Sequence, residues 1–341
     1  MSKVSAGYFF EDYRLGQVFE HATPRTVSGG ERALYTALYP TRFALYSSDE
    51  FARGCGLPES PIEDLAAFHI VFGKTVPDIS LNAVANLGYA ECQFLKPVYA
   101  GDTLRTRSEV IGLKQNSSGK NGVVWVRSTG SNQRGEAVLS YVRWVMVKKR
   151  NVEMEAPETM IPALKLALEA AELPVPEGLD FSAYDFTQAG EKHRLADYEV
   201  GEVIDHVDGV TIEEAEHMVA TRLWQNTAKV HFDASQRPDG KRLIYGGHVI
   251  SMARALSFNG LANAQMIVAI NAGTHTNPCF SGDTVRARST VLDKAETGSI
   301  GAIRLRLQAY TGEAGQSLEA VGGKPPPHVL LDLDYWALMP R

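Results

Sequence analysis

The sequence predicts an α+β protein in which one folding unit is made twice. The passage DYRLGQVFEH from Asp12 matches DYEVGEVIDH from Asp197, 185 residues further along. In the same order, PVYAGDTLRTRSEV from Pro97 matches PCFSGDTVRARSTV from Pro278, 181 residues further along. Two collinear matches whose offsets differ by only four residues indicate a tandem duplication.

Each copy has the same expected order of elements. A segment with helical spacing follows DYxxGxV, then a polar loop, and then an apolar helix, which in the second copy opens with two glycines. The later segments alternate or are rich in β-branched and aromatic residues, and they predict strands. The expected helices are 31–38, 65–74, 212–224 and 249–258, and the expected strands are 123–128, 138–147, 303–310 and 329–338. One helix followed by antiparallel strands, made twice, is an α+β pattern.

The chain divides into an N-terminal domain at 1–150, a linker at 151–193 and a C-terminal domain at 194–341. The linker is rich in acidic residues and prolines, with one short helical patch at 163–171, and we expect it to wrap the surface without entering a pocket. We also expect the sheets of the two domains to form one continuous surface, because each curved sheet must cover an edge.

Composition excludes several classes of protein. A length of 341 residues and 44% apolar content fit two ordinary domains. The formal charge of −6 includes no basic run, so nucleic acid and anionic membrane are not expected partners. No stretch reaches about 20 apolar residues, and the first residues are too polar for a signal peptide, so we expect a cytoplasmic protein. Three scattered cysteines predict buried reduced thiols, with neither a disulfide framework nor a metal site.

These features resemble the MaoC-like hydratases of the hot-dog fold. The resemblance depends on the strand entry written as proline, three residues and Gly-Asp-Thr, repeated in both halves after a long helix. It implies tandem hot-dog folds, a double hot dog, in which a curved antiparallel sheet wraps each long helix. Three passages resemble the mesaconyl-CoA hydratases within that group: SSDEFARGCGLP, AFHIVFGKTVPDISLNAVANLGYAE and VWVRSTGSNQRGE.

The resemblance implies a catalytic motif of aspartate, four residues and histidine, followed by an acidic residue. The second copy has Asn226, His231 and Asp233 at these places, so asparagine replaces the aspartate. His231 is then the titratable candidate of the motif near neutral pH, while Asn226 either orients water or caps a turn. In the first copy, Thr41 and Tyr46 stand opposite Asn226 and His231, so we expect this degenerate copy to serve binding only.

Gly246-Gly247-His248 occupies the place where the family has histidine-glycine before the long helix. Backbone N–H groups at a helix start suit a developing enolate, so Gly247 is the expected oxyanion donor and Gly246 an expected substrate contact. His248 is expected to pack against the loop. The first copy has Glu63 and Asp64 here, and these carboxylates would repel an enolate.

The implied reaction is the reversible interconversion of β-methylmalyl-CoA and mesaconyl-CoA, with no metal or cofactor beyond the coenzyme A of the substrate. The free carboxylate of this substrate predicts a cation in the pocket, for which Arg42 ranks first and Lys229 and Arg254 follow. Asp233 is a further expected substrate contact. The alternatives are a broader (3R)-hydroxyacyl-CoA dehydratase, an acyl-CoA thioesterase and a non-catalytic acyl-CoA-binding protein. A homo-oligomer is compatible with the sequence.

Overall fold

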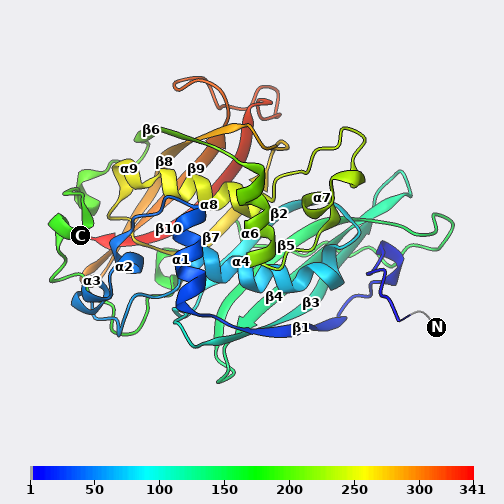
Figure 1. Cartoon of the computed structure of the whole chain (residues 1–341), viewed down its shortest axis with the longest axis horizontal. Helices are drawn as coiled ribbons and strands as arrows, with labels where there is room; N and C mark the ends of the chain where they lie inside the picture. The colour runs from blue at the N-terminus through cyan, green and yellow to red at the C-terminus, as the bar shows by residue number, and fades with distance from the viewer. Residues whose placement is uncertain (1–2) are drawn as a thin grey trace.

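The structure, a computed structural model, describes residues 3–341, and both halves of the chain show the same order of elements (Figure 1). The first half contains η1 (Phe10–Asp12), β1 (Val18–Thr26), α1 (Gly29–Leu38), α2 (Ala44–Ser47), α3 (Asp49–Gly54), α4 (Asp64–Thr75), η2 (Val76–Ser80), β2 (Ala83–Phe94), β3 (Thr103–Gln115), β4 (Asn121–Ser131) and β5 (Ala137–Lys148). The second contains η4 (Leu195–Asp197), β6 (Val203–Thr211), α6 (Glu214–Leu223), α7 (Lys229–Phe232), η5 (Ala234–Gln236), α8 (Gly246–Leu256), α9 (Phe258–Leu261), β7 (Met266–His275), β8 (Thr284–Thr297), β9 (Ile300–Tyr310) and β10 (Val329–Pro340). The expected helices and strands of both copies are present.

The ten strands form one continuous sheet in the order β1-β3-β4-β5-β2-β7-β10-β9-β8-β6. All of the strand pairs are antiparallel, and β2 pairs with β7 from Tyr89 opposite Gly273 to Gln93 opposite Ala269. This central pair joins the two halves, so each half protects one edge of the other. The predicted continuous surface is therefore confirmed.

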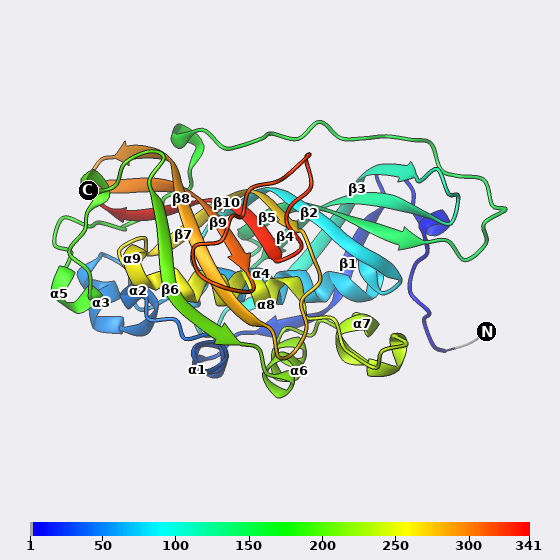
Figure 2. The same cartoon turned by 90° about the horizontal axis from the view of Figure 1, so that it is seen from above.

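The two long helices cover one face of this sheet. Figure 2 shows α4 and α8 along the same side of the strands, and the two helices are in contact at their middles, where His69 Nε2 of α4 is 2.7 Å from Ser251 Oγ of α8. Every residue of α4 is buried, as its apolar sequence predicts, and α8 is buried from Gly247 to Leu256. The helix α1 crosses these two helices and begins with a capping box. Ser28 Oγ accepts from Gly30 N, and Glu31 Oε2 accepts from Ser28 N at 2.7 Å.

The end of α6 is packed into the first half of the chain. The Trp224 ring lies 5.9 Å from the ring of Tyr35 and 5.2 Å from that of His69, between ring centroids. A Cβ atom on Gly73 would lie 1.7 Å from the Trp224 carbonyl oxygen, so only glycine permits this approach. The loop that follows Trp224 is thereby held against α4, and this loop carries Asn226 and His231.

The repeated Gly-Asp-Thr passages form the same turn in both halves. Gly101 and Gly282 have φ values of 98° and 92°, in the left-handed region that favours glycine. Asp102 Oδ2 accepts from Tyr99 N at 3.0 Å, and Asp283 Oδ2 accepts from Phe280 N at 2.8 Å. The sequence match therefore marks a matching entry into β3 and β8.

The segment between the halves crosses the sheet on the side away from α4 and α8 (Figure 2). It is mostly extended, with η3 (Ala170–Glu172) and α5 (Phe186–Ala189), so the expected helical patch at 163–171 was wrong. Its backbone forms hydrogen bonds to successive strands of the sheet. Met160 pairs with Leu113 of β3, and Leu168 N donates to Asn271 Oδ1 of β7 at 3.0 Å. Several of its side chains also belong to a buried cluster. None of these residues lines the cavity described next.

Candidate active site

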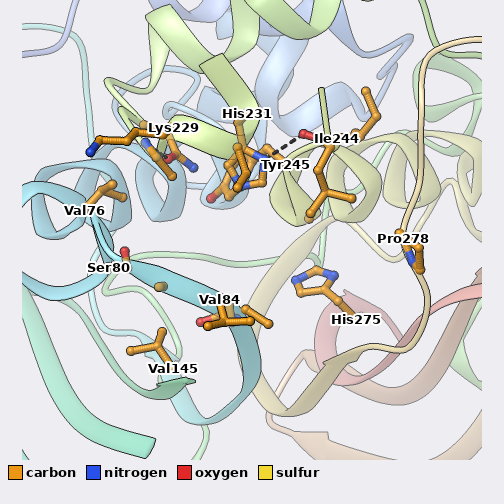
Figure 3. A pocket seen from close by; sticks show the side chains of 18 of the residues that line it. Val76, Ser80, Val84, Val145, Lys229, His231, Ile244, Tyr245, His275 and Pro278 are labelled. Carbon is orange, nitrogen blue, oxygen red and sulfur yellow. Dashed lines mark hydrogen bonds between the residues drawn. The ribbon is translucent and has the colours of Figure 1, made fainter. Parts of the chain in front are cut away.

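A cavity of about 380 Å³ lies where the two halves meet. Figure 3 shows His231 and Tyr245 on one side of it and Val84 and Val145 on the opposite side. The first half contributes residues from η2, β2 and β5, and the second contributes the loop before α8 and the end of β7. The volume is within the range of small-molecule sites, and the cavity needs both copies of the repeat to close it.

His231 lies in the short helix α7 and lines the cavity. Its Nδ1 is 2.7 Å from the carbonyl oxygen of Leu243, as the dashed line in Figure 3 indicates. A carbonyl only accepts, so Nδ1 donates and Nε2 keeps its lone pair. Burial lowers the pKa of His231 to about 4, although the Leu243 hydrogen bond acts in the opposite direction. The imidazole is neutral near pH 7 and can accept a proton at Nε2.

Asn226 is buried and also lines the cavity. Its backbone N donates to Thr221 O at 2.9 Å, and its Oδ1 accepts from Ala228 N at 3.2 Å. The side chain therefore caps the turn that connects α6 to α7. Within residues 3–341 its Nδ2 has no acceptor, so the amide N–H groups are available to a molecule in the cavity. Both expected roles of Asn226 are compatible with this geometry.

The start of α8 lies at the cavity, with Gly246 in its wall. A Cβ atom on Gly246 would lie 2.3 Å from the His275 ring, and one on Gly247 would lie 2.5 Å from the Tyr245 ring. Close packing therefore requires glycine at both positions. Neither backbone N–H has an acceptor in the part of the chain that the structure describes, as expected for the first turn of a helix. Gly246 contacts the cavity directly, and Gly247 lies behind it. His248 packs as expected, 3.0 Å from Tyr39 Oη.

The expected binding residues divide into those near the cavity and those far from it. Lys229 lines the cavity and is exposed. Asp233 is exposed outside it and instead caps η5, where Oδ1 accepts from Ser235 N at 3.0 Å. Arg42 is also outside, with its guanidinium 4.4 Å above the Phe258 ring. The expectation that Arg42 faces the substrate is therefore not met, because its loop turns it toward α9.

Arg254 is buried on the far side of α8 and does not line the cavity. Its guanidinium lies 3.7 Å from the centroid of the Phe43 ring and donates to the carbonyl oxygens of Ala264 and Gln265. These contacts give Arg254 a structural role in holding α8 to the segment before β7.

The sequence reasoning missed several polar cavity residues, among them Asn86, Arg143 and His275. His275 Nε2 is 3.1 Å from Tyr89 Oη, and burial lowers the pKa of His275 to about 4. Neither side-chain polar atom of Asn86 has a hydrogen-bond partner in the described residues. Arg143 is a charged residue inside the apolar strand β5, and this contrast was the available signal. Its partners are considered below.

The corresponding place in the first copy is filled by the protein's own side chains. Tyr46 donates to Asp64, and Thr41 Oγ1 donates to Glu63 Oε1 at 2.6 Å. All four residues are buried. Burial raises the pKa of both Glu63 and Asp64 to about 7.

Two further searches covered the described residues 3–341. No group of three or more His, Cys, Asp or Glu residues among them could hold a metal ion. None of their helices has the length and apolar character needed to span a bilayer. The three cysteines are free and buried, as expected.

Comparison with known proteins identifies the family and supports the fold. The sequence model of the mesaconyl-CoA hydratase family matches residues 2–316. A mesaconyl-CoA hydratase of Cereibacter sphaeroides is 70% identical over 342 residues, covering 99% of this chain and 100% of that protein. A β-methylmalyl-CoA dehydratase of Chloroflexus aurantiacus is 55% identical over 348 residues, covering 100% of this chain and 99% of that protein.

Solved structures show the same architecture. The crystal structure of a MaoC domain protein dehydratase from Chloroflexus aurantiacus has a TM-score of 0.97 at 55% identity and covers 100% of this chain and 99% of that one. A Mycobacterium tuberculosis protein described as a double hot-dog fold has a TM-score of 0.79 at 25% identity, covering 97% and 98%. The expected double hot dog is confirmed, and this chain belongs to the mesaconyl-CoA hydratase family.

Proposed function

We propose that this protein adds water reversibly to mesaconyl-CoA to give β-methylmalyl-CoA, with His231 as the acid–base group. The observation that carries the proposal is the His231 imidazole, which lines the cavity and is held neutral, with its Nε2 unbonded among residues 3–341. The names of the two relatives at 70% and 55% identity support the same reaction.

In the hydration direction, His231 Nε2 takes a proton from water while the water oxygen bonds to the β-carbon of the enoyl thioester. The electron pair of the C=C bond moves toward the thioester carbonyl and gives an enolate. The imidazolium then returns its proton to the α-carbon, which restores the thioester and the neutral histidine. Dehydration follows the same steps in reverse. No cofactor is needed beyond the coenzyme A that the substrate carries.

The other groups of the site prepare these two steps. An Nδ2–H of Asn226 donates to the oxygen of the attacking water, because its Oδ1 is already used by Ala228. The unpaired N–H groups at Gly246 and Gly247 lie at the positive end of the α8 dipole, and they stabilise the charge that develops on the thioester oxygen. Since Gly246 forms the wall, it is the first donor to test.

The test is a spectroscopic assay of the enoyl thioester with mesaconyl-CoA and the purified protein. We expect loss of the enoyl absorbance, appearance of β-methylmalyl-CoA and no release of free thiol. Thiol release would identify a thioesterase instead. Equal rates with straight-chain crotonyl-CoA would identify a broader dehydratase, and binding without turnover would identify a non-catalytic acyl-CoA-binding protein.

A further inference from the structure

A buried arginine of the first half lies in the cavity wall without a negatively charged partner. Arg143 is 0% exposed and lies on the inward face of β5, next to Tyr141 and Val145. Its Nη2 donates to Thr75 Oγ1 at 2.7 Å and to Ser80 Oγ at 3.3 Å. Its Nε has no acceptor in the described residues, and no ion pair to a carboxylate occurs there either.

The absence of a carboxylate is costly for a buried guanidinium. Taking an ion out of water costs several kcal/mol unless an opposite charge or a full set of hydrogen bonds compensates. Besides burial, which lowers the pKa of Arg143, the strongest electrostatic interactions with this side chain come from tyrosine hydroxyls. Arg254, the buried arginine of the other half, instead lies near two carboxyl groups and interacts with both. A ligand in the cavity can supply the charge that Arg143 lacks.

We propose that Arg143 binds the free carboxylate of the acyl group and thereby selects dicarboxylic acyl-CoA substrates over monocarboxylic ones. This assignment rests on the proposed function. A guanidinium presents parallel N–H groups that match a carboxylate, and Arg143 has an Nε–H free for such a bond. The hydroxyls of Thr75 and Ser80 accept from Nη2, and Ser80 Oγ also accepts from Nη1 at 3.4 Å, so these bonds fix the guanidinium while Nε–H stays free.

The chemistry of the reaction requires this receptor to share a cavity with the base. Conjugate addition places the hydroxyl on the β-carbon, which in a malyl-type product also bears the free carboxylate. The Arg143 guanidinium lies 4.2 Å from the Phe72 ring centroid, and the rings of Phe72 and Tyr245 are 5.8 Å apart. The Tyr245 and His231 rings are also 5.8 Å apart. A short chain of contacts therefore connects the receptor to the base across the join between the halves.

The two lysines of the cavity indicate where the coenzyme A end of the substrate would lie. Lys148 and Lys229 line the cavity and are exposed, whereas Arg143 is buried. The acyl carboxylate would therefore lie at the buried end, while the coenzyme A phosphates extend toward the exposed lysines. This orientation places the double bond between the two, beside His231.

Arg143 also has a structural alternative, because its guanidinium packs on Phe72 in cation–π geometry. A purely structural arginine affects every substrate to the same degree. A carboxylate receptor affects only substrates that carry the carboxylate. Comparing two substrates with the same carbon skeleton separates these roles.

The experiment compares kcat/KM for mesaconyl-CoA and for its methyl ester at the free carboxyl, using wild type and Arg143→Gln. In the wild type we expect the acid to be preferred by about 10²–10³-fold, as for a desolvated charge pair. Arg143→Gln should lose this preference and hydrate the ester within a few-fold of the wild-type rate. Arg254→Gln is the matched control, since it removes a buried arginine outside the cavity and should keep the preference.

A preference retained in Arg143→Gln overturns the proposal, and so does a wild type that hydrates acid and ester equally well. The wild-type comparison needs no variant, so it decides the matter if Arg143→Gln does not fold. In that case Arg143→Lys, which keeps the charge but loses the fork, should retain only part of the preference. A wild type that hydrates neither compound overturns the proposed function itself and is thereby distinguished from failure of the Arg143 assignment alone.

Discussion

The loop that carries Asn226 and His231 and its counterpart in the first half use their polar groups in opposite ways. Around the cavity, the described residues offer no partner to His231 Nε2 or to Asn226 Nδ2. In the first half the corresponding hydroxyls are used internally, Tyr46 on Asp64 and Thr41 on Glu63. A repeat can thus lose a site by satisfying its own polar groups, while its buried surface continues to support the fold.

The two buried arginines show a similar contrast between a paired and an unpaired polar group, one on a strand and the other on a helix. Arg143 is on a strand and lies over Phe72 of the facing helix α4. Arg254 is on the helix α8, and its guanidinium is 5.9 Å from the ring of Tyr335 on strand β10. Arg254 has carboxyl groups of the protein nearby, whereas Arg143 has an open cavity. Unpaired groups of both halves, Arg143 of the first and His231 of the second, therefore lie at the one cavity that has space for a ligand.

Removing the His231 imidazole should have the largest effect on the rate. We expect His231→Gln to lower kcat by about two to four orders of magnitude, because general acid–base catalysis is lost while the amide still reaches the Leu243 carbonyl. Stopped assays with mesaconyl-CoA measure the rate, and circular dichroism confirms folding. Activity within a few-fold of wild type would exclude His231 as the base.

The pH dependence of the wild-type rate tests the same assignment, because the lowered pKa of His231 predicts the direction in which the rate changes. Burial lowers the pKa of His231 to about 4, so its basic form persists through mildly acidic pH. We expect kcat/KM to stay flat from pH 7 down to about 5 and to decline as pH falls through about 4. A decline already complete at pH 6 would contradict the assigned environment of the histidine.

Asn226 should show a smaller effect, of about one to two orders of magnitude for Asn226→Ala, through lost positioning of water and a loosened turn. Asn226→Asp keeps the acceptor for Ala228 N but places a titrating carboxylate beside His231. We expect it to fold and to change the pH dependence of the rate. If the alanine variant matches wild type at every pH, Asn226 is only a turn residue, and the water must be oriented by another group.

Sequence reasoning reached the fold because the repeat contains most of the information needed. The Gly-Asp-Thr turns at Gly101 and Gly282 and the mostly apolar α4 are local features with local physical causes. His231 was predicted from the motif that the family resemblance implies, and its catalytic role stays a prediction. The apolar residues of 163–171 were misread because an extended chain contacts the sheet through them one at a time, as at Leu168.

For the proposed cation of the site, the sequence offered the charge of Arg143 within an apolar strand, but it did not show that this residue faces a cavity. Arg143 faces the cavity because of the register of β5, and its position in the repeat corresponds to Tyr335, so the repeat offered no match. Arg42 was chosen because its loop had lost the catalytic pair, but only the tertiary structure shows that loop turned toward Phe258. Pockets formed between two copies depend on contacts that no single segment specifies.

The pH dependence of stability should separate the two regions further. Around the loop that carries His231, burial lowers the pKa of His69, His217 and His248, as well as that of His231 and His275. The unfolded chain takes up these protons first, so stability should fall as pH drops from about 6.5 toward about 4. In the first half, the raised pKa of Glu63 acts in the opposite direction, because the unfolded chain ionises first and the contribution of Glu63 is lost as pH rises from about 4.5 to about 7.

A series of thermal melts from pH 4 to 9 measures both slopes. We expect Tm to fall on the acid side of neutral pH, with the opposing slope of Glu63 offsetting part of the histidine slopes. Glu63→Gln should steepen this acid decline between about pH 7 and 4.5, since the opposing carboxyl is removed while the histidines remain. An unchanged acid slope in this variant would show that Glu63 ionises normally.

The smallest effect on rate is expected from Tyr46→Phe, which changes the residue opposite His231 in the repeat. Tyr46 is buried and donates to Asp64, so its loss should lower the free energy of unfolding by about 1 kcal/mol. Because it lies outside the cavity, kcat and KM for mesaconyl-CoA should stay within about twofold of wild type once both proteins are folded. Denaturant titration and steady-state kinetics on the same preparation measure the two quantities. A large loss of kcat with stability unchanged would mean that the first copy also acts on substrate, because a buried hydroxyl that serves only the fold changes stability before it changes rate.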